Sequence, residues 1–473
     1  MTTVVWFRND LRLADNPALH AAAAKGDVVP LFIWDPGLGP HHYGAAARWW
    51  LHYSLETLDA RLRDQGATLI IRQGETREVL QSVIQETKAK HIHWNRRYDP
   101  SGIELDTALK TELQKQGLDV QSFNGNLVME PWELKTKTGG PYKVFSPFWK
   151  NLISHPLMVA PLEEPDCSVP SGLSSDRLEE LNLRPVLDWA DGFSEDWEPG
   201  CVAAAATLSA YAAGPVAHYH DQRNLPAVEG TSRLSPRLRF GELSPRQVWH
   251  AVNQHHPNAL DDEGAEAFLR EIGWREFAYH LIYHFPATVN APLRPNFERF
   301  PWRDAPDELK RWQQGMTGFP IVDAGMRQLW HTGWMHNRVR MIVASFLVKN
   351  LLISWQEGAE WFFDTLLDGD IASNTLGWQW AGGCGADAAP YFRIFNPMSQ
   401  GEKFDPDGTY VRRWVPELSS VPNKVLHRPF EAKGMELQLS GVTLGQTYPQ
   451  PIGEHKKARE RALKAFDVVK GAA

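Results

Sequence analysis

The stretch LLDGDIASNTLGWQWAGGCGADAAPYFRIFNP, residues 366–397, decides how the rest of the chain is interpreted. It places Asp368, Asp370 and Asn374 just ahead of two tryptophans. This order suits a site that hydrogen-bonds the polar edge of a ligand and stacks on its flat ring. A calcium loop is a weaker interpretation, because the glutamate at the twelfth position of an EF-hand is missing. A turn with buried tryptophans is the plainer alternative, and only the rest of the chain discriminates between them.

The composition is that of a soluble globular protein with more than one domain. The chain has 473 residues, which is too long for one hydrophobic core, and 43% of them are hydrophobic against 22% charged. The three cysteines, Cys167, Cys201 and Cys384, lie far apart and form no CxxC pair. We therefore expect a reducing compartment, no disulfide framework and no metal site.

Charge and apolar runs limit the possible partners. The net charge is −8, so binding to nucleic acid would require a locally basic patch on an acidic protein. No run of about 18 apolar residues predicts a membrane span, and the start MTTVVWFRNDLRL is charged too early for a secretory signal. We expect a cytoplasmic protein. The chain has 20 tryptophans, a number that favours stacking or redox roles for some of them besides core packing.

Three regions differ in their patterns. Residues 1–130 alternate β-rich runs, such as VVWF at 4–7 and HIHWN at 91–95, with helical patterns, which predicts a doubly wound, mostly parallel five-stranded sheet. The turn after the first strand has no GxGxxG, so the dinucleotide fingerprint is absent. Residues 131–200 are rich in Pro, Gly and acids and predict a long linker over both neighbours. Residues 201–473 predict an all-α domain.

The stretch GTSRLSPRLRFGELSPR, residues 230–246, offers hydroxyls and backbone amides where a helix begins. Thr231, Ser232 and Ser235 could cap that helix or, with Arg233 beside them, bind a phosphate. An ordinary helix cap is the plainer interpretation of this stretch taken alone.

A carboxylate, an indole and a guanidinium share one face of a predicted helix. Glu271, Trp274 and Arg275 have the spacing i, i+3 and i+4. They could form a surface ion pair beside a half-buried tryptophan. Equally, they could contact a base edge, stack on the base and hold a phosphate.

The run WMHNRVRMIVASFLVKNLL, residues 334–352, predicts a similar helix. Asn337 and Met341 share a face with Trp334, and arginines flank them, although methionine on a helix usually packs in a core. The histidines at positions 331 and 336 are five apart, which does not predict a metal site. Three further tryptophans are expected in separate helical segments, with core packing as the default: Trp302, Trp355 and Trp378.

Together these motifs resemble the photolyase/cryptochrome family, and within it the photolyases that repair cyclobutane pyrimidine dimers. The most specific pieces are PAVEGTSRLSP, WREF, GWMHNRVRM, DGD, GWQWA and YFRIFNP, and the resemblance covers essentially the whole chain. The helix RWWLHYSLETLDARL is most similar to the photolyase branch nearest to plant cryptochromes. The resemblance implies an N-terminal α/β domain, a linker and a helical domain that holds a U-shaped FAD.

The resemblance also implies which residues line the flavin. The TSRLS run would meet the diphosphate, and Asn374 would sit at flavin N5, where a neutral amide suits the reduced form. The residues implied to bind FAD are Tyr219, Thr231, Ser232, Arg233, Leu234, Ser235, Arg275, Asp368, Gly369, Asp370 and Asn374.

The implied activity is light-driven repair of DNA. A flipped-out dimer would enter a pocket over FAD, receive one electron from excited FADH⁻ and return it after the cyclobutane ring splits. As a protonated acid, Glu271 would donate a hydrogen bond to the dimer. Trp274 and Trp380 would stack against the dimer, and Asn337 and Met341 would complete the wall.

Further residues are implied to serve DNA binding and photoactivation. Those implied to contact DNA are Arg223, Trp274, Asn337, Arg338, Arg340 and Trp380. Those implied to carry electrons from the surface to oxidised flavin are Trp378, Trp355 and Trp302. The expected partner is DNA containing cyclobutane pyrimidine dimers, bound by a monomer in a bacterial cytoplasm and associated with the nucleoid through DNA.

A blue-light photoreceptor without repair activity, a cryptochrome, is the alternative function. The intact lesion pocket, Asn374 in place of an acid and the absence of a signalling tail argue against it. A (6-4) photolyase would need a histidine where Asn337 stands. A plain FAD oxidoreductase would require a hydride-donor site, and no nicotinamide fingerprint is present.

The antenna chromophore is less well defined by the sequence. In one branch of the family an Asn-Glu pair after the fourth strand holds a folate, whereas this chain has Ser101 and Gly102 at the matching positions. The cryptochrome-like RWW helix favours methenyltetrahydrofolate bound elsewhere on the N-terminal domain, with 8-hydroxy-5-deazaflavin as the alternative.

Overall fold

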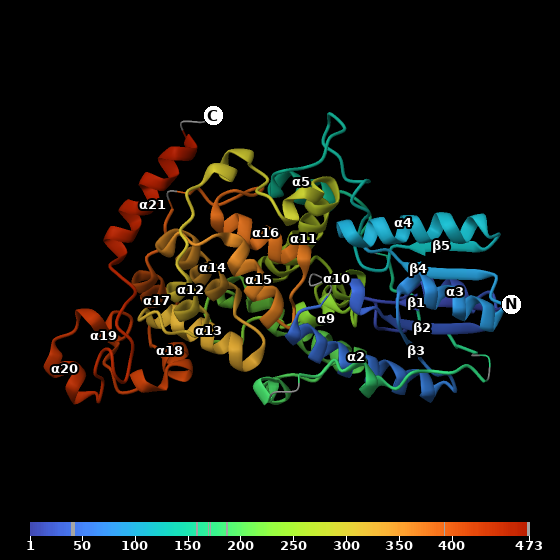
Figure 1. The fold of residues 1–473 in the computed structure, drawn as a ribbon, viewed down its shortest axis with the longest axis horizontal. Coiled ribbons are helices and arrows are strands. Elements are labelled where there is room, and N and C mark those ends of the chain that lie inside the picture. The colour runs from blue at the N-terminus through green and yellow to red at the C-terminus, as the bar shows by residue number, and fades with distance from the viewer. Residues whose placement is uncertain are drawn as a thin grey trace.

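The computed structural model of the protein describes residues 1–38, 43–157, 159–168, 170, 172–185, 188–391 and 393–470. Phe392 of the YFRIFNP motif lies outside these residues. A parallel sheet with helices on both faces forms one end of the molecule, and a larger body of helices forms the other (Figure 1).

The sheet has five parallel strands in the order β3-β2-β1-β4-β5, as predicted. The strands are β1 Thr3–Phe7, β2 Val28–Trp34, β3 Ile70–Gln73, β4 His91–Asn95 and β5 Asp119–Phe123. Side chains of β1 alternate between two buried layers, because successive residues of a strand point to opposite faces. Val5 and Phe7 pack in the core that includes α1 and α2, whereas Val4 and Trp6 pack in the core that includes α3 and α4.

Helices flank the sheet at the positions that the sequence indicates. They are α1 Pro17–Ala23, α2 Ala45–Asp64, α3 Thr76–Thr87 and α4 Pro100–Lys115. Asn16 and Asp99 cap α1 and α4 by accepting a backbone N–H, and a proline follows each cap at the first helical position. These local signals fix where the two helices start.

The segment 131–200 contacts both ends of the molecule. It contains α5 Phe145–Leu152 and α6 Phe193–Asp196. The carbonyl of Leu162 accepts the Asp15 N–H at 2.8 Å, which ties the segment to the sheet end. Trp149 of α5 packs against Trp249 of the helical body, with ring centroids 6.0 Å apart.

The remaining described chain is helical, as predicted. Its helices are α7 Cys201–Ala213, α8 Tyr219–Gln222, α9 Ser235–Arg239, α10 Pro245–His255, α11 Glu263–His284, α12 Pro306–Gln313, α13 Pro320–Thr332, α14 Asn337–Ser345, α15 Trp355–Thr365, α16 Ile371–Gly382, α17 Pro397–Phe404, α18 Thr409–Trp414, α19 Asn423–Leu426, α20 Gly434–Leu439 and α21 His455–Lys470. None of the helices in the described residues is both long and apolar enough to cross a bilayer.

Two sequence expectations about these helices are wrong. The helix predicted for 334–352 begins only at Asn337, because the His336 side chain caps it by accepting the Arg338 N–H at 3.2 Å. Trp334 therefore lies outside the helix and does not share its face. Trp302 is not helical either, since it lies in the irregular segment before α12.

A buried carboxylate joins the sheet end to the helical body. Glu242, which is 1% exposed, accepts hydrogen bonds from Trp50 Nε1 at 2.8 Å and Ser54 Oγ at 2.5 Å, both on α2. It also accepts the Gly200 N–H at 2.7 Å, just before α7. This contact holds α2 against the helices that build the candidate site.

Candidate functional site

Helix α16 lies at the centre of the candidate site, where it packs against α11, α14 and α15. Asp370 caps its N-terminus, with one carboxylate oxygen accepting the Ser373 N–H at 2.8 Å. The other oxygen accepts the Tyr279 hydroxyl of α11 at 2.5 Å. The cap thus fixes α16 to α11 as well as starting the helix.

The other two residues of the DGD motif are held by arginine side chains. Both oxygens of Asp368 accept from Arg340, at 3.0 and 2.8 Å, and the Gly369 carbonyl accepts from Arg239 Nε at 3.0 Å. A two-bond contact between a carboxylate and a guanidinium is strong and directional. The guanidinium of Arg340, which the resemblance implies in DNA binding, is thus paired with the DGD motif and keeps a partly exposed side chain.

The side-chain amide of Asn374 has a defined orientation. Its Nδ2 donates to the Ala359 carbonyl of α15 at 2.8 Å. That contact leaves the amide oxygen as the group that can accept a hydrogen bond from a ligand. Asn374 is half-buried one turn into α16.

The TSRLS segment combines unsatisfied donors with an unusual backbone. Arg233 adopts a left-handed conformation with φ of 53° and stacks over Trp197 and Trp334, at 4.1 and 5.4 Å from the ring centroids. Its Nε is buried and has no hydrogen-bond partner, and burial lowers the pKa of the guanidinium. Helix α9 begins two residues later, at Ser235; because Pro236 has no N–H, the first-turn amides that could bind an anion are those of Ser235 and Arg237.

Arg275 links the helical site to the N-terminal region. Its guanidinium donates to the Asn126 carbonyl at 2.8 Å and lies over the ring of Tyr279, 4.9 Å from the centroid. Because Tyr279 also binds Asp370, Arg275 and the DGD motif belong to one connected group.

Glu271 is a half-buried carboxyl paired with Arg223. Their side chains approach to 2.7 Å, and the guanidinium also lies over the Tyr219 ring at 5.2 Å. Burial raises the pKa of Glu271 above its ordinary value, and Arg223 and Arg270 only partly offset that effect. The site therefore contains a carboxyl group that takes up a proton more readily than a free glutamate does.

The predicted stacking residues lie at the partly open edge of the candidate site. Trp274 and Trp380 are half-buried, Met341 is half-buried on α14, and Asn337 is exposed at the first position of that helix. Trp274 stacks face to face on Phe145 of α5, with centroids 3.6 Å apart. Rings with a covered face and an accessible remainder suit stacking of a planar ligand.

Arg338 is held at this edge by contacts other than an ion pair, as far as the described residues show. It donates to the Asn224 side-chain oxygen at 2.6 Å and lies over Phe404, 4.4 Å from the centroid. His336 beside it is buried, and burial with repulsion from neighbouring arginines lowers its pKa to about 4. The positive charge here comes from the arginines, since the imidazole is neutral near pH 7.

The three tryptophans of the predicted electron chain belong to one hydrophobic core. Trp355 and Trp378 are buried in it, and Trp302 packs against it from a partly exposed position. Trp378 contacts Phe362 edge to face at 5.0 Å, and Trp302 lies against Phe300 at 4.3 Å.

Gly358 of α15 is required by the position of Trp378. A Cβ atom at Gly358 would lie 2.1 Å from the indole. We expect Gly358→Ala to lower the free energy of unfolding by about 1–3 kcal/mol through overpacking. Gly377→Ala in α16 is the matched control, because nothing lies within 4 Å of its Cβ position. It should raise stability by up to about 1 kcal/mol, and equal effects of both changes in denaturant titrations would contradict the packing.

Sequence reasoning missed several residues that hold the site together. Tyr279 lies one helical turn after Arg275, and Arg239 lies within the quoted 230–246 stretch, so local spacing could have indicated both. Phe145, Trp197 and Asn224 gave no such signal, because they meet the site only through the tertiary fold.

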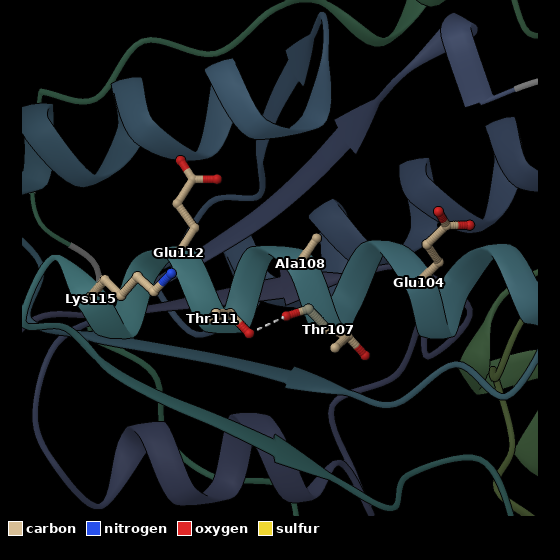
Figure 2. A pocket seen from close by; sticks show the side chains of 6 residues that line it. All are labelled: Glu104, Thr107, Ala108, Thr111, Glu112 and Lys115. Carbon is tan, nitrogen blue, oxygen red and sulfur yellow. Dashed lines mark hydrogen bonds between the residues drawn. The ribbon is translucent and has the colours of Figure 1, made fainter.

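Other potential sites are weaker. In the described parts of the chain, no three His, Cys, Asp or Glu side chains are placed to hold a metal ion. A shallow depression along α4 is lined by Glu104, Thr107, Ala108, Thr111, Glu112 and Lys115 (Figure 2). It shares no residue with the group around α16.

Comparisons with known proteins agree with this architecture. The family model described as "DNA photolyase" matches residues 3–166, and "FAD binding domain of DNA photolyase" matches residues 268–468. A deoxyribodipyrimidine photo-lyase of Agrobacterium fabrum is 49% identical, with 99% of this chain and 98% of that protein covered. Cryptochrome-1 of Arabidopsis thaliana is 39% identical, covering 98% of this chain and 70% of that protein.

Among solved structures, a bacterial class III photolyase from Agrobacterium tumefaciens superposes with a TM-score of 0.96 at 49% identity, covering 99% of this chain and 98% of that one. The parallel sheet and the helical site thus define a protein built like photolyases and cryptochromes. The chain belongs to the DNA photolyase family.

Proposed function

We propose that this protein is a light-driven DNA repair enzyme that splits cyclobutane pyrimidine dimers. The observation that carries the proposal is the pair of side chains on one face of α11: the half-buried carboxyl of Glu271, whose pKa is raised, and the half-buried indole of Trp274. A proton donor beside a stacking surface suits a pyrimidine pair with carbonyl groups at its edge. The photo-lyase relatives support this proposal over a photoreceptor without repair activity, which stays the alternative.

The cofactor is FAD, in line with the matched FAD-binding domain. The donors present fit such a ligand: Thr231, Ser232 and the first amides of α9 suit its diphosphate, and the buried, unpartnered Nε of Arg233 adds positive charge. Among the other implied ligands, Asp368 is held by Arg340, Asp370 by Tyr279 and Arg275 by the Asn126 carbonyl.

The oxygen of Asn374 would accept a hydrogen bond from N5–H of the reduced flavin, since its amide nitrogen is already engaged. When bound and excited by light, reduced FAD supplies one electron to the dimer and receives it back. The protonated carboxyl of Glu271 donates a hydrogen bond to a carbonyl of the dimer, where negative charge develops. Trp274, Trp380 and Met341 hold the two pyrimidines and exclude water.

DNA would be held by basic side chains around the residues proposed to bind the dimer. Arg223, Arg338 and Arg340 are the arginines proposed to meet phosphates. The segment 134–150 adds four exposed lysines and contains no acid: Lys135, Lys137, Lys143 and Lys150. Within the described residues, none of these lysines pairs with a carboxylate, whereas Lys25 pairs with Asp119. This is the locally basic surface that an acidic protein needs to bind DNA.

Trp378, Trp355 and Trp302 are proposed to carry electrons to oxidised flavin during photoactivation. We expect Trp302→Phe to slow photoreduction of oxidised flavin, because phenylalanine is much harder to oxidise than tryptophan. Repair by protein reduced chemically beforehand should be unchanged. The absorbance of oxidised flavin under blue light measures the rate, and a rate equal to that of the wild type would remove Trp302 from the chain.

We further propose residues 1–130 as the antenna-binding domain, 131–200 as the linker and 201–473 as the catalytic domain. The antenna is proposed to be methenyltetrahydrofolate rather than 8-hydroxy-5-deazaflavin, because the RWW helix of α2 is similar to that of the branch near plant cryptochromes. We propose a monomer acting on DNA in a bacterial cytoplasm.

Binding in the dark separates repair from sensing. A repair enzyme should bind a duplex that contains one dimer much more tightly than the same undamaged duplex, because its pocket accepts the flipped lesion. Affinity should also fall with salt, with a log–log slope near −0.9 for each neutralised phosphate. Equal affinity for both duplexes would favour the photoreceptor alternative.

A further inference from the structure

We propose that Phe145, a residue of the connecting segment, positions the indole of Trp274 for lesion binding. The inference rests on the proposed function and adds a residue outside the helical body to the lesion site. Phe145 begins α5, is 1% exposed and would not touch the lesion itself. It is therefore a positioning residue that acts through Trp274.

The two rings form the tightest aromatic stack around the site. Their centroids are 3.6 Å apart and their planes differ by only 6°. Phe277 touches the same indole edge to face, at 5.9 Å. One face of Trp274 is thus covered by Phe145, its edge is held by Phe277, and the partly exposed remainder is available to a ligand.

Helix α5 is itself held firmly against α11. A Cβ atom at Gly273 would lie 2.5 Å from the Trp149 ring, so a glycine next to Trp274 permits the close approach of the two helices. Phe148 packs on Phe277 at 5.1 Å, and the guanidinium of Arg270 lies over Phe145 at 5.3 Å. Phe145 has no freedom to leave the indole.

A fixed indole binds a planar ligand more tightly than a mobile one, because less side-chain freedom is lost on binding. Aromatic pairs contribute beyond the area that they bury. Loss of the Phe145 ring should therefore weaken binding of the flipped dimer while leaving the phosphate contacts of undamaged DNA in place. Ordinary core packing of Phe145 predicts no such selectivity.

Two leucine substitutions on the same helix test the assignment. Phe145→Leu should weaken dark binding of dimer-containing duplex by about three- to tenfold, with binding of undamaged duplex changed by less than about twofold. Phe148→Leu is the comparison, since Phe148 is equally buried and contacts Phe145, Phe277 and His280 but makes no ring contact with Trp274 among the described residues. It should weaken binding of the damaged duplex clearly less than Phe145→Leu does. Repair yield at saturating DNA should fall less than affinity does in Phe145→Leu.

The contrary outcomes are distinct. Equal losses for damaged and undamaged duplex, equal effects of the two leucine variants, or no effect of Phe145→Leu would each overturn the inference. If Phe145→Leu fails to fold, Phe145→Met keeps the volume without the flat ring and should show the same selective loss. A wild-type protein with no preference for the dimer would instead overturn the proposed function, and the inference with it.

Discussion

Replacing Asp368 with asparagine is expected to strip the protein of its flavin. The change removes the charge that both nitrogens of Arg340 contact, at 3.0 and 2.8 Å, and leaves a half-buried guanidinium without its counterion. Breaking such a pair costs about 3 kcal/mol. Because Asp368 lies two residues before Asp370, the cap of α16, the cost falls on the element that carries Asn374 and Trp378. We expect purified Asp368→Asn to be nearly colourless and to unfold at a lower temperature.

A second ion pair in the helical body provides the control. Arg327 and Glu417 approach to 2.8 Å, with an arginine about as exposed as Arg340, at 23% against 24%. Glu417→Gln should cost no more than about 1 kcal/mol, since both partners keep contact with water, and should retain flavin fully. The ratio of flavin to protein absorbance measures retention. Full flavin content in Asp368→Asn would contradict the assigned role of the DGD motif.

Glu271→Ala should retain flavin yet repair fewer dimers per absorbed photon. The carboxyl lies on α11 with Arg223 as its ion-pair partner, whereas the proposed flavin ligands are held by other contacts. A hydrogen bond to a charged group contributes about 1.5–3 kcal/mol, and ring splitting competes with electron return, so we expect a two- to tenfold lower yield. An unchanged yield from Glu271→Ala would refute its role as hydrogen-bond donor.

The pH dependence follows from the direction of the Glu271 pKa. Burial raises this pKa above 4.5, so the carboxyl keeps its proton at a higher pH than a free glutamate. If Arg223 turns to a DNA phosphate, its opposing effect is lost and the pKa rises further. The wild-type yield should therefore fall as pH increases through the raised pKa. Glu271→Gln keeps a donor that does not titrate, so its yield should stay level across that range.

Much of the fold could be predicted because its signals are local. The β-rich runs at 4–7 and 91–95 are buried strands, and α11 shows the face that carries Glu271 and Trp274. The start of α14 was misplaced since the cap is a histidine, which propensity does not favour at that position, while Trp334 continued the apolar pattern.

The partners of the site residues could not be predicted in the same way. The Arg340–Asp368 pair spans 28 residues, and the sequence offers no rule that chooses an aspartate over a phosphate for that arginine. The stack of Phe145 on Trp274 joins the connecting segment to α11, beside a close approach of Trp149 that requires a glycine at position 273. Residue types indicated the chemistry of the site, while tertiary packing determined which groups remain free for a ligand.

Repair under blue light tests the central claim most directly. Reduced, flavin-loaded protein is mixed with DNA containing cyclobutane pyrimidine dimers, illuminated, and followed through the recovery of thymine absorbance. Recovery should continue over many turnovers, stop in the dark and leave the flavin in its reduced form, because the electron returns after each cycle. No recovery from a sample that is reduced, loaded with flavin and bound to the damaged DNA would contradict the account.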